Sequence, residues 1–226
     1  MALMKTISKI ITVSCLALGC ATQNQPSSPI SSETLKAEIL NQYVVNNSAA
    51  AGDYLSALTR RVALGANLSY LPNIILLQEE APLAFSLPSS EVFISTGMVK
   101  KVSSEAELAF IVAHELGHAV LRHHGKESTD GSFEIEADKY AAEVLSNAGY
   151  DPTTSLTALL NTYGADGFVE QTLRVSNVGR HAFYHPTLKA RLSELRGRVV
   201  TLKRIQFSAL NENMRAFQIF KVAVIS

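Results

Sequence analysis

Hydrophobic residues recur with two different spacings along the chain, and these predict mostly helices with one small group of strands. Apolar residues three or four apart predict helices over residues 33–46 and 49–64. Short apolar runs bounded by prolines follow them and predict strands, of which the last two are joined in a hairpin by a Pro-Ser-Ser turn. The predicted strands span residues 73–78, 84–87 and 91–95.

The most hydrophobic helix is predicted in the middle of the chain. Leu108 to Ala113 is apolar on every side of a helix, so this helix belongs in a core. Ser104 and Glu107 have the spacing of a capping box at its start. Gly125 predicts its end, which places residues 122–124 in the last turn, where positive charge is favourable.

Most of the remaining chain is also predicted to be helical. One helix is expected over residues 133–147, and Asp151-Pro152 opens the next. His185-Pro186 begins another helix that runs to about Arg196. Residues 199–226 alternate apolar and basic residues and fit a strand as well as a helix. The fold class is therefore α+β, mostly helical, with a small sheet or hairpin next to the central helix.

The composition agrees with one globular domain. Of 226 residues, 47% are hydrophobic and 18% are charged. Twenty basic and 20 acidic residues give a formal net charge of zero. No nucleic-acid partner is therefore expected.

Residues 1–19 have the pattern of an export signal. Lys5 and Lys9 lead into an apolar run that is too short to span a bilayer. The run ends at Cys20 in the sequence LALGC, which resembles a bacterial lipoprotein signal, although Ala17 stands where leucine is usual. The alternative is an ordinary secretory signal that is cut nearby.

A lipoprotein signal would make Cys20 the lipidated start of the mature protein, anchored to a membrane without a spanning helix. Residues 20–32 are polar and contain proline, so they predict a flexible tether. Residues 33–226 are then the folded domain. In this class of signals Ala21, rather than aspartate, implies the outer membrane, and we expect the protein on its periplasmic side.

The central helix carries the motif His-Glu-x-x-His at His114, Glu115 and His118. Residues four apart share one face of a helix, so the two imidazoles can bind one metal ion. Glu115 projects about 100° from His114 and can reach a water on that metal. This is the pattern of a catalytic zinc helix with its general base. We expect one zinc ion per chain.

A catalytic zinc needs a third protein ligand, and the next helix offers three candidates. Glu134 and Asp138 are four residues apart and share a face, whereas Glu136 points elsewhere. Glu134 could bind the metal while Asp138 accepts a hydrogen bond from a ligand imidazole. The spacing alone fits equally well with three surface carboxylates in the first turn of a helix.

His123 and His124 are further candidate ligands. The alternative, which we adopt, is that they supply positive charge at the C-terminal end of the central helix.

Four segments resemble the zinc metallopeptidase family that contains the CAAX prenyl endopeptidase, HtpX and BepA, and they occur in that family's order within residues 74–191. They are AFSLPSSEVFISTGMV, ELAFIVAHELGHAVLRHH, FEIEADKYAAEVLSNAGYDP and HPTLKAR. The resemblance implies a zincin-like domain of gluzincin type, with Glu134 as the third ligand and Asp138 as its paired aspartate. With no spanning segment predicted, the chain is most similar to the periplasmic lipoprotein members. It departs from the family at Leu83 and at Ser89-Ser90, where Asn and Gly-Gly are common.

The resemblance also implies roles in the His-Pro segment. His185 could donate a hydrogen bond to the oxyanion of the reaction or fill the open zinc position in a resting state, and we assign it to the catalytic residues. The alternative is a residue that only caps a helix. Arg191 matches the family's arginine and is expected to tie its helix down rather than contact substrate.

Together these features predict a zinc metalloendopeptidase of the bacterial envelope, with Glu115 as general base. An extended substrate would add as a strand beside residues 91–95, which favours unfolded or misassembled envelope proteins. One alternative is a zinc-stabilised chaperone or assembly factor whose protease site is closed by His185. The other is a different zinc hydrolase, such as a cell-wall amidase, against which the Glu-x-x-x-Asp pattern argues.

Overall fold

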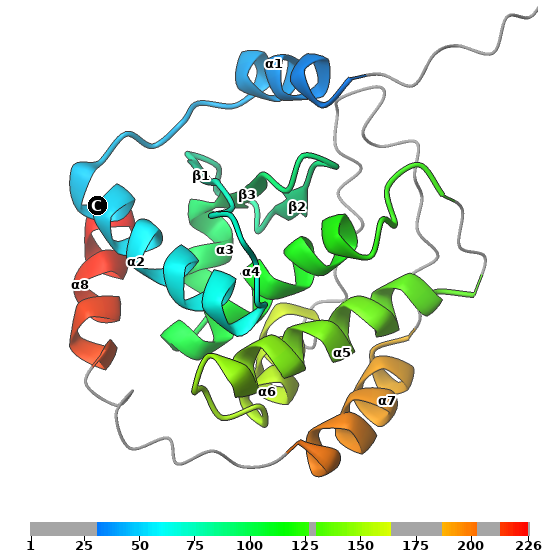
Figure 1. Cartoon of the computed structure of the whole chain (residues 1–226). Coiled ribbons are helices and arrows are strands. Elements are labelled where there is room, and N and C mark those ends of the chain that lie inside the picture. Colours follow the sequence, from blue (N-terminus) through cyan, green and yellow to red (C-terminus); the bar gives the residue numbers. More distant parts are fainter. Residues whose placement is uncertain (1–30, 127–129, 164–186, 203–212, 226) are drawn as a thin grey trace, which may run out of the picture.

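The computed structural model describes residues 31–126, 130–163, 187–202 and 213–225, and Figure 1 shows their arrangement. These residues form a small three-stranded sheet surrounded by helices, as the hydrophobic pattern predicts. The helices are α1 Ser32–Gln42, α2 Ala49–Gly65, α3 Thr96–Lys101, α4 Glu105–Val120, α5 Ser132–Asn147, α6 Thr154–Tyr163, α7 Leu188–Thr201 and α8 Asn213–Ile225. The strands are β1 Ile74–Leu77, β2 Ala84–Ser86 and β3 Val92–Ser95.

The order of the sheet is β1-β3-β2, with β3 in the middle. β3 pairs in parallel with β1 and antiparallel with β2. The outer edge of β1 is covered by a bridge between Val45 and Leu77. The prediction that a substrate pairs beside residues 91–95 is therefore wrong, because both edges of that strand are already hydrogen-bonded. Among the described residues, the strand with an unpaired edge is β2.

The two faces of the sheet pack on different layers. On one face, Phe85 and Phe93 stack with ring centroids 5.0 Å apart, and Ile39 of α1 joins them in a small apolar cluster. The other face contributes Val92 and Ile94 to the main core, which also contains the apolar residues of α4. The sheet thus lies between α1 and the central helix, and β2 lies close to α4 (Figure 1).

The central helix α4 begins with a modified capping box. Ser104 Oγ accepts a hydrogen bond from the backbone N–H of Glu107 at 3.2 Å. The Glu107 carboxylate accepts from the N–H of Ser103 at 2.8 Å, one residue earlier than the standard box requires. Every residue from Leu108 to Ala113 is at most 3% exposed, which confirms that the helix crosses the core.

The end of α4 differs from the prediction. The helix ends at Val120, and Arg122 adopts a left-handed backbone with φ 59°, so the chain turns before Gly125 is reached. Residues 122–124 therefore lie beyond the helix rather than in its last turn. The first helix also ends earlier than predicted, at Gln42 instead of residue 46.

α5 packs closely along α4, and the contact is made at a glycine. A Cβ atom at Gly117 would lie 3.0 Å from Cδ1 of Tyr140 and 3.4 Å from Cα of Ala137. A Cβ atom at this position would require the Tyr140 ring to shift by a few tenths of an ångström, which explains a glycine inside a buried helix despite its cost of about 1 kcal/mol. This contact fixes the distance between the two helices that carry the predicted metal ligands.

The C-terminal segment, for which the sequence left strand and helix open, forms the helix α8 over residues 213–225. Phe217 and Phe220 are buried against α2, where Phe220 stacks on Tyr54 with centroids 4.3 Å apart. α8 closes the core on the side opposite α5 and α7 (Figure 1). Within the described ranges, no helix has both the length and the apolar character needed to cross a membrane.

Two glycines of α2 provide a test of the packing between α2 and α5. A Cβ at Gly65 would lie 2.5 Å from the carbonyl oxygen of Val144, whereas a Cβ at Gly52 would meet nothing within 4 Å. We expect Gly65→Ala to lower the free energy of unfolding by about 1–3 kcal/mol. Gly52→Ala should raise it by up to about 1 kcal/mol, because alanine favours the helix. Urea unfolding followed by circular dichroism measures both, and a stable Gly65→Ala protein would contradict the packing.

Candidate metal centre

Two helices bring the three predicted metal ligands together. His114 and His118 lie one turn apart on α4, and Glu134 lies in the first turn of α5. Their candidate ligand atoms are all within 4.8 Å of one another, and all three residues are buried. The two Nε2 atoms are 3.2 Å apart, and the Glu134 carboxylate oxygens lie 3.5 Å from His114 Nε2 and 3.3 Å from His118 Nε2.

These separations fit a tetrahedral metal ion. Nitrogen and oxygen ligands lie about 2.0–2.1 Å from zinc, so tetrahedral ligand atoms are about 3.3–3.4 Å from one another. The three observed separations are close to this value, and the two histidines meet different oxygens of the Glu134 carboxylate, Oε2 for His114 and Oε1 for His118. Two imidazoles and one carboxylate are also a donor set typical of catalytic zinc, in which a fourth position serves water or substrate. The arrangement therefore fits zinc in both chemistry and size.

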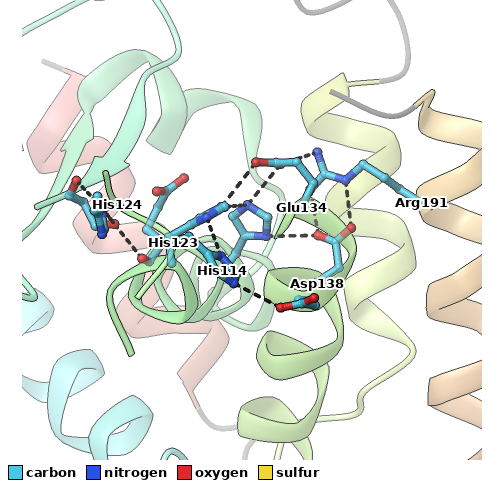
Figure 2. A network of polar contacts seen from close by, with 10 residues as sticks. His114, His123, His124, Glu134, Asp138 and Arg191 are labelled. Carbon is cyan, nitrogen blue, oxygen red and sulfur yellow. Dashed lines mark hydrogen bonds and ion pairs between the residues drawn. The ribbon is translucent and has the colours of Figure 1, made fainter. Parts of the chain in front are cut away.

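Asp138 supports the first histidine. Its Oδ1 atom lies 3.0 Å from Nδ1 of His114, on the side of the ring opposite the ligand nitrogen (Figure 2). A carboxylate in this position fixes the orientation of a ligand imidazole and the nitrogen that carries its proton. Asp138 thus lies beside the ring of His114, as the family resemblance implied, but Nδ1 of His114 makes no hydrogen bond of standard geometry.

Arg191 of α7 joins the same network. Its Nε and Nη2 atoms donate to the two carboxylate oxygens of Asp138 at 2.8 and 2.7 Å, and Nη1 lies 3.1 Å from Glu134 Oε2 (Figure 2). The guanidinium also stacks over the ring of Tyr163 at 4.6 Å. Arg191 thus ties α7 to α5, as expected, and also holds the carboxylate of the predicted third ligand. Its contact with Glu134 and the place of Tyr163 were not predicted.

The electrostatics of this buried cluster favour a cation. Burial by itself would lower the pKa of His114, but Asp138 and Glu134 outweigh burial and raise the pKa to about 10. The guanidinium of Arg191 and the contact with His114 outweigh burial at Asp138 and lower the pKa of its carboxyl. Without a metal, a proton on His114 therefore compensates the negative charge. A metal ion would replace that proton, because a ligand histidine must be neutral.

Glu115, the predicted general base, follows His114 directly and is only partly buried. The low polarity of its surroundings raises the pKa of its carboxyl, while the charges of His114 and His118 act in the opposite direction. A raised pKa brings a carboxylate closer to the range suited to proton transfer at neutral pH. The backbone carbonyl of Glu115 accepts a hydrogen bond from Ser86 Oγ at 2.7 Å, which connects this part of α4 to β2.

The remaining candidates lie in different places. Glu136 points away from the three ligands, as predicted, and its side chain is 55% exposed. His123 and His124 do not flank the end of α4: His123 is buried against His118 and Glu136, and His124 Nε2 lies 3.0 Å from the carbonyl oxygen of Ser86. No periodicity could have placed them, because they follow the unpredicted turn at Arg122. His185 and Cys20 lie outside the described residues.

Comparisons with known proteins agree with this site. Residues 49–131 match the sequence model of peptidase family M48, a match that includes the HExxH motif and ends before Glu134. This part of the chain is therefore similar to peptidase family M48, whose members use a metal, usually zinc. The fold described above, mostly helical with a small sheet, is consistent with a zincin-like peptidase domain of that family.

The chain is also similar to three proteins named as mitochondrial metalloendopeptidase OMA1. It is 26% identical to the Arabidopsis thaliana protein over 153 residues, 52% of this chain and 30% of that protein. It is 24% identical to the Schizosaccharomyces pombe protein over 178 residues, 63% and 51% of the two chains. A third similarity, to the Bos taurus protein, is 39% over 46 residues, 20% and 9% of the two chains. The chain thus spans between 9% and 51% of the length of these relatives.

The metal centre can be tested by removing one carboxylate at a time. Glu134→Ala should weaken zinc binding by more than the roughly 10–100-fold that loss of an outer partner costs, because a direct ligand is lost. Glu143→Ala is the matched control on the same helix and should stay within about fivefold, because its carboxylate lies further along α5 and pairs with Arg198. Competition with a chromophoric chelator measures both affinities. Equal losses at the two positions would remove Glu134 from the ligand set.

Proposed function

We propose that the protein is a zinc-dependent endopeptidase. The observation that carries the proposal is the placement of Glu115 directly beside three donors, His114, His118 and Glu134, whose spacing fits one zinc ion. A purely structural zinc site has four protein ligands and needs no such carboxylate. The similarity of residues 49–131 to a peptidase family supports hydrolysis of peptide bonds, and the OMA1 relatives are themselves named metalloendopeptidases.

Each residue of the site has a separate role in hydrolysis. Bound zinc would supply Lewis acidity, which polarises a peptide carbonyl and lowers the pKa of water towards 7. Glu115 takes the proton from the attacking water as the oxygen–carbon bond forms. Glu115 then gives that proton to the departing amine as the carbon–nitrogen bond breaks, which regenerates its carboxylate. Asp138 and Arg191 hold His114 and Glu134 in place throughout.

The unpaired edge of β2 is the place we assign to an extended substrate. The backbone bonds Ser95 N–H to Leu83 O and Leu87 N–H to Glu91 O mark the hydrogen-bonded pairs of the hairpin. By the alternation of antiparallel ladders, the intervening Ala84 and Ser86 direct their N–H and C=O groups away from β3. Backbone groups at such an edge recognise a peptide largely without regard to its side chains.

His124 limits this edge at one end. Its Nε2 atom lies 3.0 Å from the Ser86 carbonyl oxygen, which by the same alternation points away from β3. A peptide would therefore find the N–H and C=O of Ala84 and the N–H of Ser86. Recognition through so few backbone groups requires an extended, unstructured segment. This favours unfolded or misassembled polypeptides as substrates.

We further propose that the protein works in the bacterial cell envelope as a quality-control protease. The proposal rests on the lipoprotein-like sequence that ends at Cys20, which would place the catalytic domain at the periplasmic side of the outer membrane. The relatives are named mitochondrial, so the location of this chain is argued from its own N-terminal sequence.

The catalytic proposal predicts a separation of metal binding from turnover. Glu115→Gln should retain zinc and the fold, because glutamine is nearly isosteric and Glu115 is not a ligand. Cleavage of an unfolded protein should fall by at least about 10²–10⁴-fold, because glutamine cannot accept the proton. Glu143→Gln, which changes a partly exposed glutamate paired with Arg198, is the matched control and should cleave normally. Undiminished cleavage by a zinc-loaded Glu115→Gln protein would defeat the proposal.

The location is tested at Cys20. If this residue carries lipid, Cys20→Ser should move the mature protein from the membrane fraction to the soluble periplasm. Metabolic labelling with a fatty acid should lose its signal in the same variant. A Cys20→Ser protein that stays in the membrane fraction would contradict the lipid anchor and leave the catalytic proposal untouched.

A further inference from the structure

His123 makes a contact that the catalytic scheme does not use. It is 1% exposed, and its Nδ1 atom lies 3.1 Å from Nδ1 of His118, the ring nitrogen that does not face the other ligands. Its other nitrogen, Nε2, lies 3.2 Å from Glu136 Oε2. The ring stacks on Phe133 with centroids 4.3 Å apart and planes 7° from parallel. Figure 2 shows His123 next to the ligand cluster.

The hydrogen bonds that run from His118 through His123 to Glu136 allow one consistent arrangement of protons. His118 turns Nε2 towards His114 and Glu134, so that nitrogen must keep its lone pair for a metal. A neutral His118 then carries its proton on Nδ1 and donates it to Nδ1 of His123. His123 in turn carries its own proton on Nε2 and donates it to Glu136. Each of the two imidazoles then donates one hydrogen bond in the direction of Glu136. The two Nδ1 atoms that face each other share a single proton, which is bonded to His118.

The two ligand histidines therefore have different neighbours at Nδ1, the ring nitrogen that faces away from the metal site. His114 has a buried carboxylate, Asp138, behind its ring, and that carboxylate is neutralised by Arg191. His118 has a neutral imidazole behind its ring, and the carboxylate comes one step later, at the surface. A second buried carboxylate there would add uncompensated charge, since Arg191 already contacts both Asp138 and Glu134. An imidazole accepts the bond without that charge.

We infer that His123 is a positioning residue for the metal: it holds the ring and tautomer of His118 so that Nε2 faces the zinc site. This inference rests on the proposed zinc site but not on proteolysis. The stack on Phe133, the residue before Glu134, further ties the segment after α4 to the start of α5. The same residue thus sets the orientation of one ligand and the spacing to another.

Two substitutions separate the hydrogen bond from packing. His123→Phe keeps an aromatic ring on Phe133 but has no acceptor for His118. His123→Asn loses the ring stack but keeps an oxygen close to the position of Nδ1. We expect zinc affinity, measured by chelator competition on the full mature chain, to fall about 10–100-fold in His123→Phe and to be largely restored in His123→Asn. Lys139→Gln, which removes an exposed ion pair with Glu194, is the control and should bind zinc normally.

A measurement on the wild-type protein does not depend on how the variants fold. In the zinc-loaded chain with ¹⁵N-labelled histidines, a scalar coupling should be observed between Nδ1 of His118 and Nδ1 of His123, with the proton on His118. A missing coupling, or a His123→Phe protein that binds zinc as tightly as wild type, would overturn the inference. An Asn variant as weak as the Phe variant would do the same. A wild-type chain that binds no zinc would instead refute the proposed function.

Discussion

The close contact between α4 and α5 is the constraint on which the rest of the site depends. Gly117 lets the two helices approach until Tyr140 and Ala137 touch the α4 backbone. At that distance Glu134 reaches the two imidazoles on α4, and Asp138, one turn further along α5, reaches the back of His114. A site built from the faces of two rigid helices holds its donor atoms more accurately than one built on loops.

Charge explains why a third helix joins the site. Two carboxylates and two imidazoles are removed from water at the α4–α5 contact, and buried charges are stable only when they are paired. Arg191 of α7 supplies one positive charge, and His114, protonated without metal, supplies another. Zinc would take over the second role. The same residues therefore balance one another's charge without metal and form a favourable site for metal binding.

The sequence predicted those parts of the site that depend on spacing within one helix. The pairing of His114 with His118 follows from residues four apart sharing a face. For Glu134 and Asp138 the same spacing left surface carboxylates equally possible, and the resemblance to a known family decided between the two. The sequence did not predict the features that depend on where a helix ends or on how the strands are ordered in the sheet. A non-glycine residue, Arg122, takes the left-handed conformation that ends α4, so His123 turns back into the core. The central place of β3 arises from parallel pairing with β1, a contact that no local pattern contains.

The central claim is that one zinc ion is held by His114, His118 and Glu134. Crystals of the zinc-loaded mature protein, measured with X-rays at the zinc absorption edge, test it most directly. We expect a single anomalous peak about 2.0–2.2 Å from Nε2 of both histidines and from one carboxylate oxygen of Glu134. An anomalous peak at other residues, or a zinc with Asp138 in place of Glu134 among its ligands, would contradict it.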